Sequence, residues 1–328
     1  MVIPQGVAYA ALAGMPVVTG IYASMLPALV AALFSASPRL SVGPTALSSL
    51  LVAASLTGLA TPGSAEWVNL AVWLALLTGA LQIALGAVQA GWLLNLVTAP
   101  VLMAFTQGAA VLIIFSQLPA LLGLPKDGDW AARLTGAHWA SAAFGIGALA
   151  LLVVARRLKP SFPGVLVVVL VAAAVSAFTP YAAQGGAVVG PLPQGLPGLF
   201  VPHWPGWATL GQLVMPTLII TLVSFLETAS SAKVDSAARG ARWDQNQDLI
   251  GQGLAKLASG LSGAFPTSSS FSRSALNLYA GAKTGWASIF SAVVVTSRYA
   301  GSRSAAVTFG DGWVACNHSN RAIAASSL

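Results

Sequence analysis

The chain has 328 residues, of which 56% are hydrophobic and only 7% are charged, and its mean hydropathy is +0.80. Soluble domains carry about 25% charged residues, so this composition excludes an ordinary soluble fold and indicates a polytopic helical membrane protein. The net charge of +7 comes from basic residues scattered through loops, which excludes a nucleic-acid-binding groove, and the single cysteine, Cys316, gives no internal disulfide and no metal-ligand set.

The first half of the chain alternates apolar segments with proline, glycine and charged turns. Met1–Ala13 is apolar but shorter than the about 20 residues that cross a bilayer, so it is either a broken helix or a helix whose beginning is missing. Within Trp67–Ala90, Gly79, Gly86 and Ala90 are suited to close helix packing, and Gln82 and Gln89 are suited to interhelical hydrogen bonds. The other expected spans of this half are Met15–Ala36, Leu93–Leu122, Ala140–Ala155 and Val165–Phe178.

A loop rich in glycine and proline, Thr179–Trp207, marks the boundary between the halves. Beyond it, the apolar spans Thr209–Ala232 and Leu249–Ala264 flank the most charged stretch, Lys233–Asp248. The last apolar segment, Ile289–Val295, has barely begun when the sequence becomes polar. We therefore predict a transmembrane domain over residues 1–296, consisting of a first repeat (about 1–183), a linker (184–208) and a partial second repeat (209–296), followed by an atypical polar tail, 297–328, that is out of frame or otherwise foreign.

Two stretches share an unusual chemistry, in which a Pro-Thr pair is followed by small residues and serines. They are Ser41–Ser49 and Phe265–Arg273; in the second, Ser269 or Ser270 can cap a helix that continues through 274–278. A polar break inside a bilayer is tolerated only in protein or beside a wet cavity, and a helix N-terminus favours an anion. Such paired segments indicate an inverted-repeat transporter with two half-helices meeting at mid-membrane. The alternative is that each is only a helix cap.

Ionisable residues inside apolar segments are costly and therefore usually functional. Glu227 can bind a proton, hold a cation or pair with Arg273, and a structural ion pair is the alternative; Ser231 lies one helical turn further on the same face. Arg273 can offset the negative charge of a substrate, or it can snorkel or pair with Glu227. Lys256 is ambiguous, since it can snorkel or face the same cavity.

Gln5 and Tyr9 are four residues apart and share a helix face, so they can supply an amide donor and an aromatic wall. The alternative is interhelical hydrogen bonding and an interfacial aromatic. Enzyme motifs are missing from the sequence: Gly281–Thr284 lacks the glycine that precedes the lysine of a phosphate-binding loop, and the three histidines have no ligand spacing. The sequence thus predicts neither an enzyme nor a cofactor or metal site.

Several short motifs occur in the order typical of one transporter family: Ile3–Ala10, Gly20–Ser24, Leu40–Ala46, Asn246–Ile250 with Gly253–Ala255, Gly263–Pro266, and Ser270–Asn277. Together they cover most of residues 1–295. On these motifs the chain resembles the SulP (sulfate permease-type) anion transporters. The resemblance implies an all-α fold of two inverted seven-helix repeats, here incomplete, divided into a core and a gate.

The resemblance also implies a substrate site between the third- and tenth-helix half-helices. By position in the motifs, the expected substrate-binding residues are Gln5, Tyr9, Thr45, Ala46, Ser270, Phe271, Ser272 and Arg273. Glu227 and Ser231 match the eighth-helix positions for a coupling ion or an ion pair. Members carry sulfate, bicarbonate, chloride or dicarboxylates by cation symport or exchange. Compared with the family, the first helix looks clipped, and the STAS domain and the helices after the eleventh are missing.

The expected function is secondary active transport of a small anion, with a sulfate-like anion first and H⁺ or Na⁺ as candidate coupling ions. An anion channel on the same scaffold and a non-transporting truncated remnant are the alternatives; a nucleobase permease is disfavoured by Arg273. The expected setting is the bilayer of a bacterial inner membrane, with the oligomeric state open between monomer and homodimer. The N-terminus is expected in the cytoplasm, because most loop arginines and lysines fall on one side.

Overall fold

The computed structural model describes residues 2–37, 39–96, 99–124, 135–136, 138–158, 164–179, 181, 196–240, 242–279 and 281–300. The chain forms two compact units, which are described separately. The larger unit comprises Val2–Gln107 and Pro193–Gly301, and the smaller unit includes Gly108–Leu192. Most of the expected loop at 125–139, the first part of the linker (184–195), and the tail from 301 onward lie outside the described residues.

The described residues are almost entirely helical, as expected. Three segments are long and apolar enough to cross a membrane: Val17–Phe34, Ala65–Ala87 and Trp207–Ala237. The larger unit contains α1 (Val2–Leu12), α2 (Val17–Tyr22), α3 (Leu26–Phe34), α4 (Ala46–Leu56), α5 (Ala65–Ala87), the 3-10 helix η1 (Ala90–Leu96), α10 (Trp207–Arg239), α11 (Gln245–Leu261), α12 (Phe271–Tyr279) and α13 (Trp286–Ala300). The division between the units falls within α6 (Ala99–Leu121), and the smaller unit contains α8 (Trp139–Leu158) and α9 (Gly164–Phe178).

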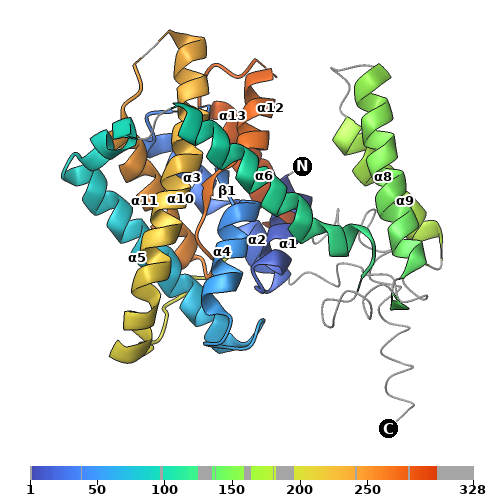
Figure 1. Ribbon diagram of the computed structural model, residues 1–328, viewed down its shortest axis with the longest axis horizontal. Coiled ribbons are helices and arrows are strands. Elements are labelled where there is room, and N and C mark those ends of the chain that lie inside the picture. The colour runs from blue at the N-terminus through green and yellow to red at the C-terminus, as the bar shows by residue number, and fades with distance from the viewer. Residues whose placement is uncertain are drawn as a thin grey trace. The chain divides into compact units, whose positions relative to one another are not determined.

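Two very short strands lie at the centre of the larger unit (Figure 1). β1 (Val42–Gly43) and β2 (Ser268–Ser269) pair antiparallel, with Val42 opposite Ser269 and Gly43 opposite Ser268. β1 leads into α4 and β2 leads into α12. These helices have 11 and 9 residues, so at about 1.5 Å per residue each covers roughly half of a bilayer core of about 30 Å. The two predicted half-helices are therefore present, and their starting ends meet at the strand pair.

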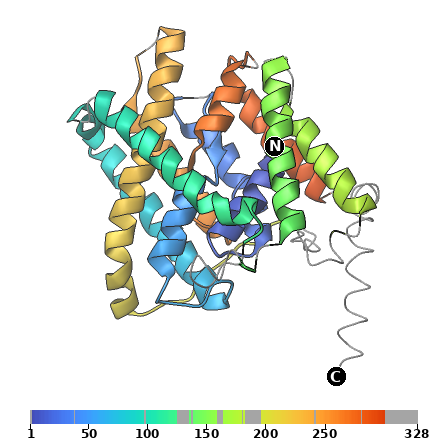
Figure 2. The same ribbon diagram turned by 45° about the vertical axis from the view of Figure 1, so that its right-hand side comes forward.

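Glycines let α5 and α11 approach closely beside the half-helices. A Cβ atom on Gly79 would lie 2.8 Å from the carbonyl oxygen of Gly253, and one on Gly86 would lie 2.7 Å from Cγ1 of Ile250. Small residues at such positions allow van der Waals contact between backbones, which stabilises helix pairs in lipid. The predicted packing roles of Gly79 and Gly86 are confirmed, and α5, α10 and α11 lie side by side in both Figure 1 and Figure 2.

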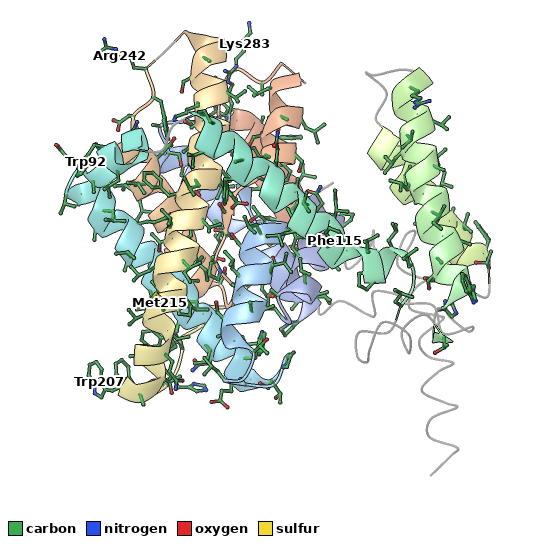
Figure 3. All side chains as sticks on the ribbon, viewed as in Figure 1. Trp92, Phe115, Trp207, Met215, Arg242 and Lys283 are labelled. Carbon is green, nitrogen blue, oxygen red and sulfur yellow. The ribbon has the colours of Figure 1, made fainter. Side chains whose placement is uncertain are left out.

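The buried core and the apolar exterior of the larger unit are clearly separated. Trp67 of α5 is 1% exposed, and its Nε1–H donates to the carbonyl oxygen of Ala13 at 2.9 Å. By contrast, Met215 and Trp207 of α10 are exposed and point outward (Figure 3), as suits lipid-facing side chains. Figure 3 also places Arg242 and Lys283 together at the end of this unit opposite to Trp207.

Two of the predicted spans differ in detail from the helices. The span expected over Met15–Ala36 is present as Val17–Phe34, but the helix breaks between α2 and α3, where Pro27 has no N–H with which to continue the hydrogen-bond ladder. α10 runs seven residues beyond the predicted end at Ala232, through Arg239, and closes with Gly240 in the left-handed conformation at φ 63°. The apolar pattern ends before the helix does, because α10 continues into the charged stretch.

The two C-terminal helices of the described chain also refine the predictions. α12 begins at Phe271, so of the two expected capping residues, Ser269 and Ser270, it is Ser270 that occupies the N-cap position. α13 spans Trp286–Ala300, so it starts before the predicted Ile289 and continues past Ser297, where the sequence becomes polar.

Candidate functional site

The start of α4 places a hydroxyl against a buried carboxylate. Thr45 is the N-cap of α4, and its Oγ1 accepts a hydrogen bond from the backbone N–H of Ser48 at 3.3 Å. The same hydroxyl donates to Oε2 of Glu227, in the middle of α10, at 3.3 Å. Glu227 is only 5% exposed, and Ala46, the first residue of α4, is also buried. The capping residue thus connects this half-helix directly to the intramembrane carboxylate.

The start of α12 is more open than that of α4. Ser270 is buried, Phe271 is half-buried and Ser272 is exposed, and the hydroxyl oxygens of the two serines are 3.3 Å apart. The backbone nitrogen of Arg273 lies 3.5 Å from Ser270 Oγ, which is longer than an ordinary N–H···O bond. The serine hydroxyls are therefore only weakly engaged in capping the helix, which leaves them able to bind a ligand.

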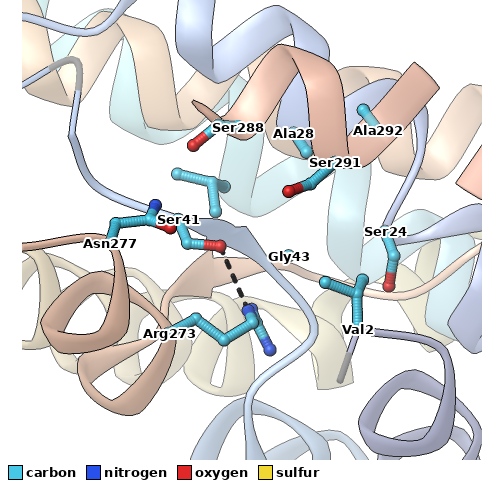
Figure 4. A pocket seen from close by; sticks show the side chains of 11 residues that line it. Val2, Ser24, Ala28, Ser41, Gly43, Arg273, Asn277, Ser288, Ser291 and Ala292 are labelled. Atoms are coloured by element: carbon cyan, nitrogen blue, oxygen red, sulfur yellow. Dashed lines mark hydrogen bonds between the residues drawn. The ribbon is translucent and has the colours of Figure 1, made fainter. Parts of the chain in front are cut away.

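Arg273 is held by neutral partners only. Its Nη1 donates to the carbonyl oxygen of Pro44 at 3.0 Å and to Oε1 of Gln5 at 3.4 Å, and its Nε donates to Ser41 Oγ at 3.2 Å (Figure 4). The side chain is 5% exposed, and Nη2 has no hydrogen-bond partner. Among the described residues, no carboxylate lies within 4.0 Å of this guanidinium. The ion pair that those residues do form joins Arg39 to Asp235 and does not involve Arg273. The positive charge of Arg273 is therefore available to an anion.

The first helix reaches the same place. Gln5 accepts the hydrogen bond from Arg273, so in this structure its amide oxygen faces the guanidinium. Tyr9, one turn further along α1, interacts electrostatically with both Arg273 and Glu227. Hence the predicted residues of α1, α4, α10 and α12 come together around the starting ends of the two half-helices. The most distant of them in sequence, Gln5 and Arg273, are 268 residues apart.

Glu227 and Arg273 do not form an ion pair in the part of the chain that the structure describes. Besides Thr45, the side chain of Ser268 in β2 is hydrogen-bonded to the Glu227 carboxylate. Ser231, one turn beyond Glu227, is buried, and its hydroxyl has no hydrogen-bond partner. The carboxylate is thus solvated by hydroxyl groups, with a further free hydroxyl beside it on the same helix face.

A buried lysine adds to the site that the sequence predicted. Lys256 of α11 is fully buried, and its Nζ donates to Oε1 of Gln82 at 2.9 Å and to Oγ of Ser224 at 2.7 Å. It therefore does not snorkel. Gln82 makes the interhelical contacts predicted for it, since its Nε2 also faces the carbonyl oxygen of Thr221 at 3.4 Å. Ser224 precedes Glu227 by three residues and so shares its helix face, which is the signal in the sequence for this contact.

The centre of the larger unit can therefore attract and hold an anion. It buries two cations, Lys256 and Arg273, against one carboxylate, Glu227, and two helix N-termini add partial positive charge. Buried polar groups normally find hydrogen-bond partners. Here several donors within the described residues have none: Ser48 Oγ, Ser231 Oγ, Thr267 Oγ1 and Arg273 Nη2.

Comparison with known proteins agrees with this architecture. The sequence profile of the Sulfate permease family matches residues 1–301. A probable sulfate transporter of Mycobacterium tuberculosis is 34% identical over 290 residues, which cover 86% of this chain and 52% of that protein. The chloroplastic sulfate transporter 4.1 of Arabidopsis thaliana is 32% identical over 314 residues, covering 90% of this chain and 45% of that protein. The chain thus spans about half the length of these relatives.

Two solved structures share the fold. The murine solute carrier 26 family member A9 anion transporter, in its inward-facing state, gives a TM-score of 0.81 at 22% identity, covering 96% of this chain and 57% of that one. The transmembrane domain of the cyanobacterial bicarbonate transporter BicA gives a TM-score of 0.80 at 20% identity, covering 96% of this chain and 83% of that one. With the profile match over residues 1–301, this likeness leads to one conclusion: the chain is a membrane protein that belongs to the sulfate permease family.

Proposed function

We propose that the chain provides the anion-carrying part of a secondary active transporter for small anions, with a sulfate-like inorganic anion as the first candidate. The observation that carries the proposal is Arg273, a buried guanidinium at the start of a half-helix that no carboxylate of the described residues contacts. A buried charge that lacks a counter-charge is costly, and an entering anion supplies that counter-charge.

The residues proposed to bind the anion come from three helices. Gln5 and Tyr9 contribute from α1, Thr45 and Ala46 from the start of α4, and the start of α12 contributes Ser270, Phe271, Ser272 and Arg273. Backbone N–H groups at helix starts lack partners within the helix, so they can hydrogen-bond to anion oxygens. The relatives named as sulfate transporters support sulfate as the anion to test first. Because the chain spans only about half of them, transport activity is itself part of the proposal.

We further propose that transport is coupled, by symport or exchange, and that the N-terminus lies on the cytoplasmic side of a bacterial inner membrane. The orientation rests on Arg242 and Lys283, which lie at the same end of the larger unit (Figure 3), because cytoplasmic ends carry an excess of basic residues. The protein acts as a carrier and not as an enzyme, either alone or as a homodimer.

The test is uptake of radiolabelled sulfate by liposomes that contain the whole chain. We expect Arg273→Met to reduce uptake at least about tenfold, since removing a buried charge that binds the substrate costs more than about 1.4 kcal/mol. Arg242→Met is the matched control: Arg242 is exposed, so uptake should be unchanged. Equal uptake by both variants would contradict the proposed site. Unitary currents in planar bilayers would instead favour a channel, and a monodisperse protein without anion uptake would favour a non-transporting remnant.

A further inference from the structure

Lys256 is the buried charge that the proposed anion site does not use. Its side chain is fully buried among α5, α10 and α11, with neutral hydrogen-bond partners at 2.7 and 2.9 Å. A lysine is almost never fully buried unless it is paired, because removing an ammonium group from water costs several kcal/mol. In the part of the chain that the structure describes, no carboxylate lies within 4.0 Å of it. Its partner must therefore act at longer range.

A chain of hydrogen bonds leads from Lys256 to Glu227. The ammonium group donates to Ser224 Oγ, whose hydroxyl donates to Ser268 Oγ at 3.1 Å. The Ser268 side chain is in turn hydrogen-bonded to the Glu227 carboxylate. The Ser224 hydroxyl accepts from the ammonium group and donates to Ser268, so this link is polarised by the lysine charge. The Ser268 hydroxyl also lies within 3.5 Å of the carbonyl oxygen of Ser224.

Lys256 and Arg273 bind different neighbours of Glu227. The Lys256 ammonium group binds Ser224, which lies three residues before Glu227 on the same face of α10. Arg273 instead contacts Ser41, Pro44 and Gln5 on the side of the half-helix starts. The three charges at the half-helix starts and beside them thus divide into a pair, Lys256 with Glu227, and one remaining cation, Arg273.

We propose that the Lys256 ammonium group is the permanent counter-cation of Glu227, so that this carrier needs no bound Na⁺ to complete its site; the inference rests on the proposed anion transport. A carboxylate inside a membrane protein must be neutralised by a proton, a metal cation or a fixed cation. Here the fixed cation is covalently attached to the protein and linked to the carboxylate through two serines. The charge of Arg273 is then left free for the transported anion.

The first experiment compares sulfate uptake by the whole chain in sodium gluconate and in N-methyl-D-glucamine gluconate. The wild type should be equally active in both salts. Lys256→Met removes the ammonium group but keeps a long side chain; its uptake should fall at least about tenfold without Na⁺ and recover when Na⁺ can approach Glu227. Lys256→Arg keeps the charge and should remain independent of Na⁺.

Two results would overturn the inference. One is wild-type uptake that falls about tenfold when Na⁺ is removed. The other is a folded, monodisperse Lys256→Met protein that is equally impaired in both salts, since Lys256 would then be a structural group only.

A second measurement keeps the inference testable if Lys256→Met does not fold or if the wild type takes up no sulfate. Thermal unfolding of the purified wild type in detergent is followed at increasing Na⁺ and constant ionic strength. We expect no saturable stabilisation by Na⁺, because Lys256 already occupies the role of the cation. Saturable stabilisation would overturn the inference. An absence of uptake in every salt, by contrast, would count against the proposed transport function and not against the pairing of Lys256 with Glu227.

Discussion

The two half-helices begin alike but meet opposite charges. At the start of α4, Thr45 caps the helix and donates to Glu227. At the start of α12, Ser270 occupies the capping position, and Arg273 in the first turn binds only neutral groups. The comparison teaches that the centre has two sides. On the acidic side, the Glu227 carboxylate is hydrogen-bonded by hydroxyl groups, and Lys256 balances its charge. On the basic side, the positive charge of Arg273 has no counter-charge among the described residues. An anion is therefore expected on the α12 side.

The largest expected effect comes from separating α1 from the basic side. Gly20 of α2 packs against Gly6 of α1 so closely that an added Cβ atom would lie 1.9 Å from the Gly6 carbonyl oxygen. Gly20→Ala therefore has to push α1 away, and with it Gln5, the acceptor for Arg273. We expect a loss of about 3 kcal/mol in the free energy of unfolding, measured by thermal and chemical unfolding in detergent.

Gly211→Ala is the matched control for that variant. Gly211 also lies in a helix, α10, but has no atoms within 4 Å of the position that a Cβ atom would take. Its replacement should leave stability unchanged or raise it slightly, because alanine is the better helix former. A Gly20→Ala protein as stable as Gly211→Ala would show that α1 can shift without cost.

An intermediate effect is expected on the affinity for sulfate, which should change in opposite directions when the acidic side and the basic side are altered. Glu227→Gln removes one negative charge, so the centre becomes more positive and sulfate should bind about tenfold more tightly. Arg273→Gln removes one positive charge, and sulfate should bind about tenfold more weakly. Calorimetric titration of the purified variants measures both constants. Shifts in the same direction would refute the division into two sides.

The smallest effect should separate the two caps. Thr45→Val removes the oxygen that accepts from Ser48 N–H and should cost about 1 kcal/mol of stability. Thr45→Ser keeps that oxygen and serves as the control. Ser270→Ala should cost less than about 0.5 kcal/mol, because the contact from Arg273 N is already 3.5 Å long. An equal loss for Thr45→Val and Ser270→Ala would mean that the caps are equivalent.

Much of this centre could be predicted from local sequence. The two Pro-Thr segments indicated the half-helices, because proline and hydroxyl residues at a helix start leave a local signal. Glu227 and Arg273 stood out as charges inside apolar segments. The pairing of β1 with β2 could not be predicted, since two-residue strands are too short to show a periodic pattern.

The role of Lys256 also depends on information that the sequence alone does not contain. Its position inside an apolar span marked it as unusual, but its partners, Gln82 and Ser224, come from two other helices. Which residues meet across three helices is decided by their packing, here by the close approach of Gly79 and Gly253. The end of α10 is a different case: Gly240 was a usable stop signal, and the charged residues before it concealed the continuing helix.

The pairing of β1 with β2 has a consequence for how the protein is made. Pro44 follows β1, and its contact with Arg273 spans 229 residues of sequence. A ribosome that adds about 5–20 residues per second needs roughly 10–50 seconds for that interval. Throughout it, α4 is a helix too short to cross the bilayer by itself, and the backbone of β1 waits for its partner strand. The centre of the larger unit is therefore completed only after β2 has been synthesised.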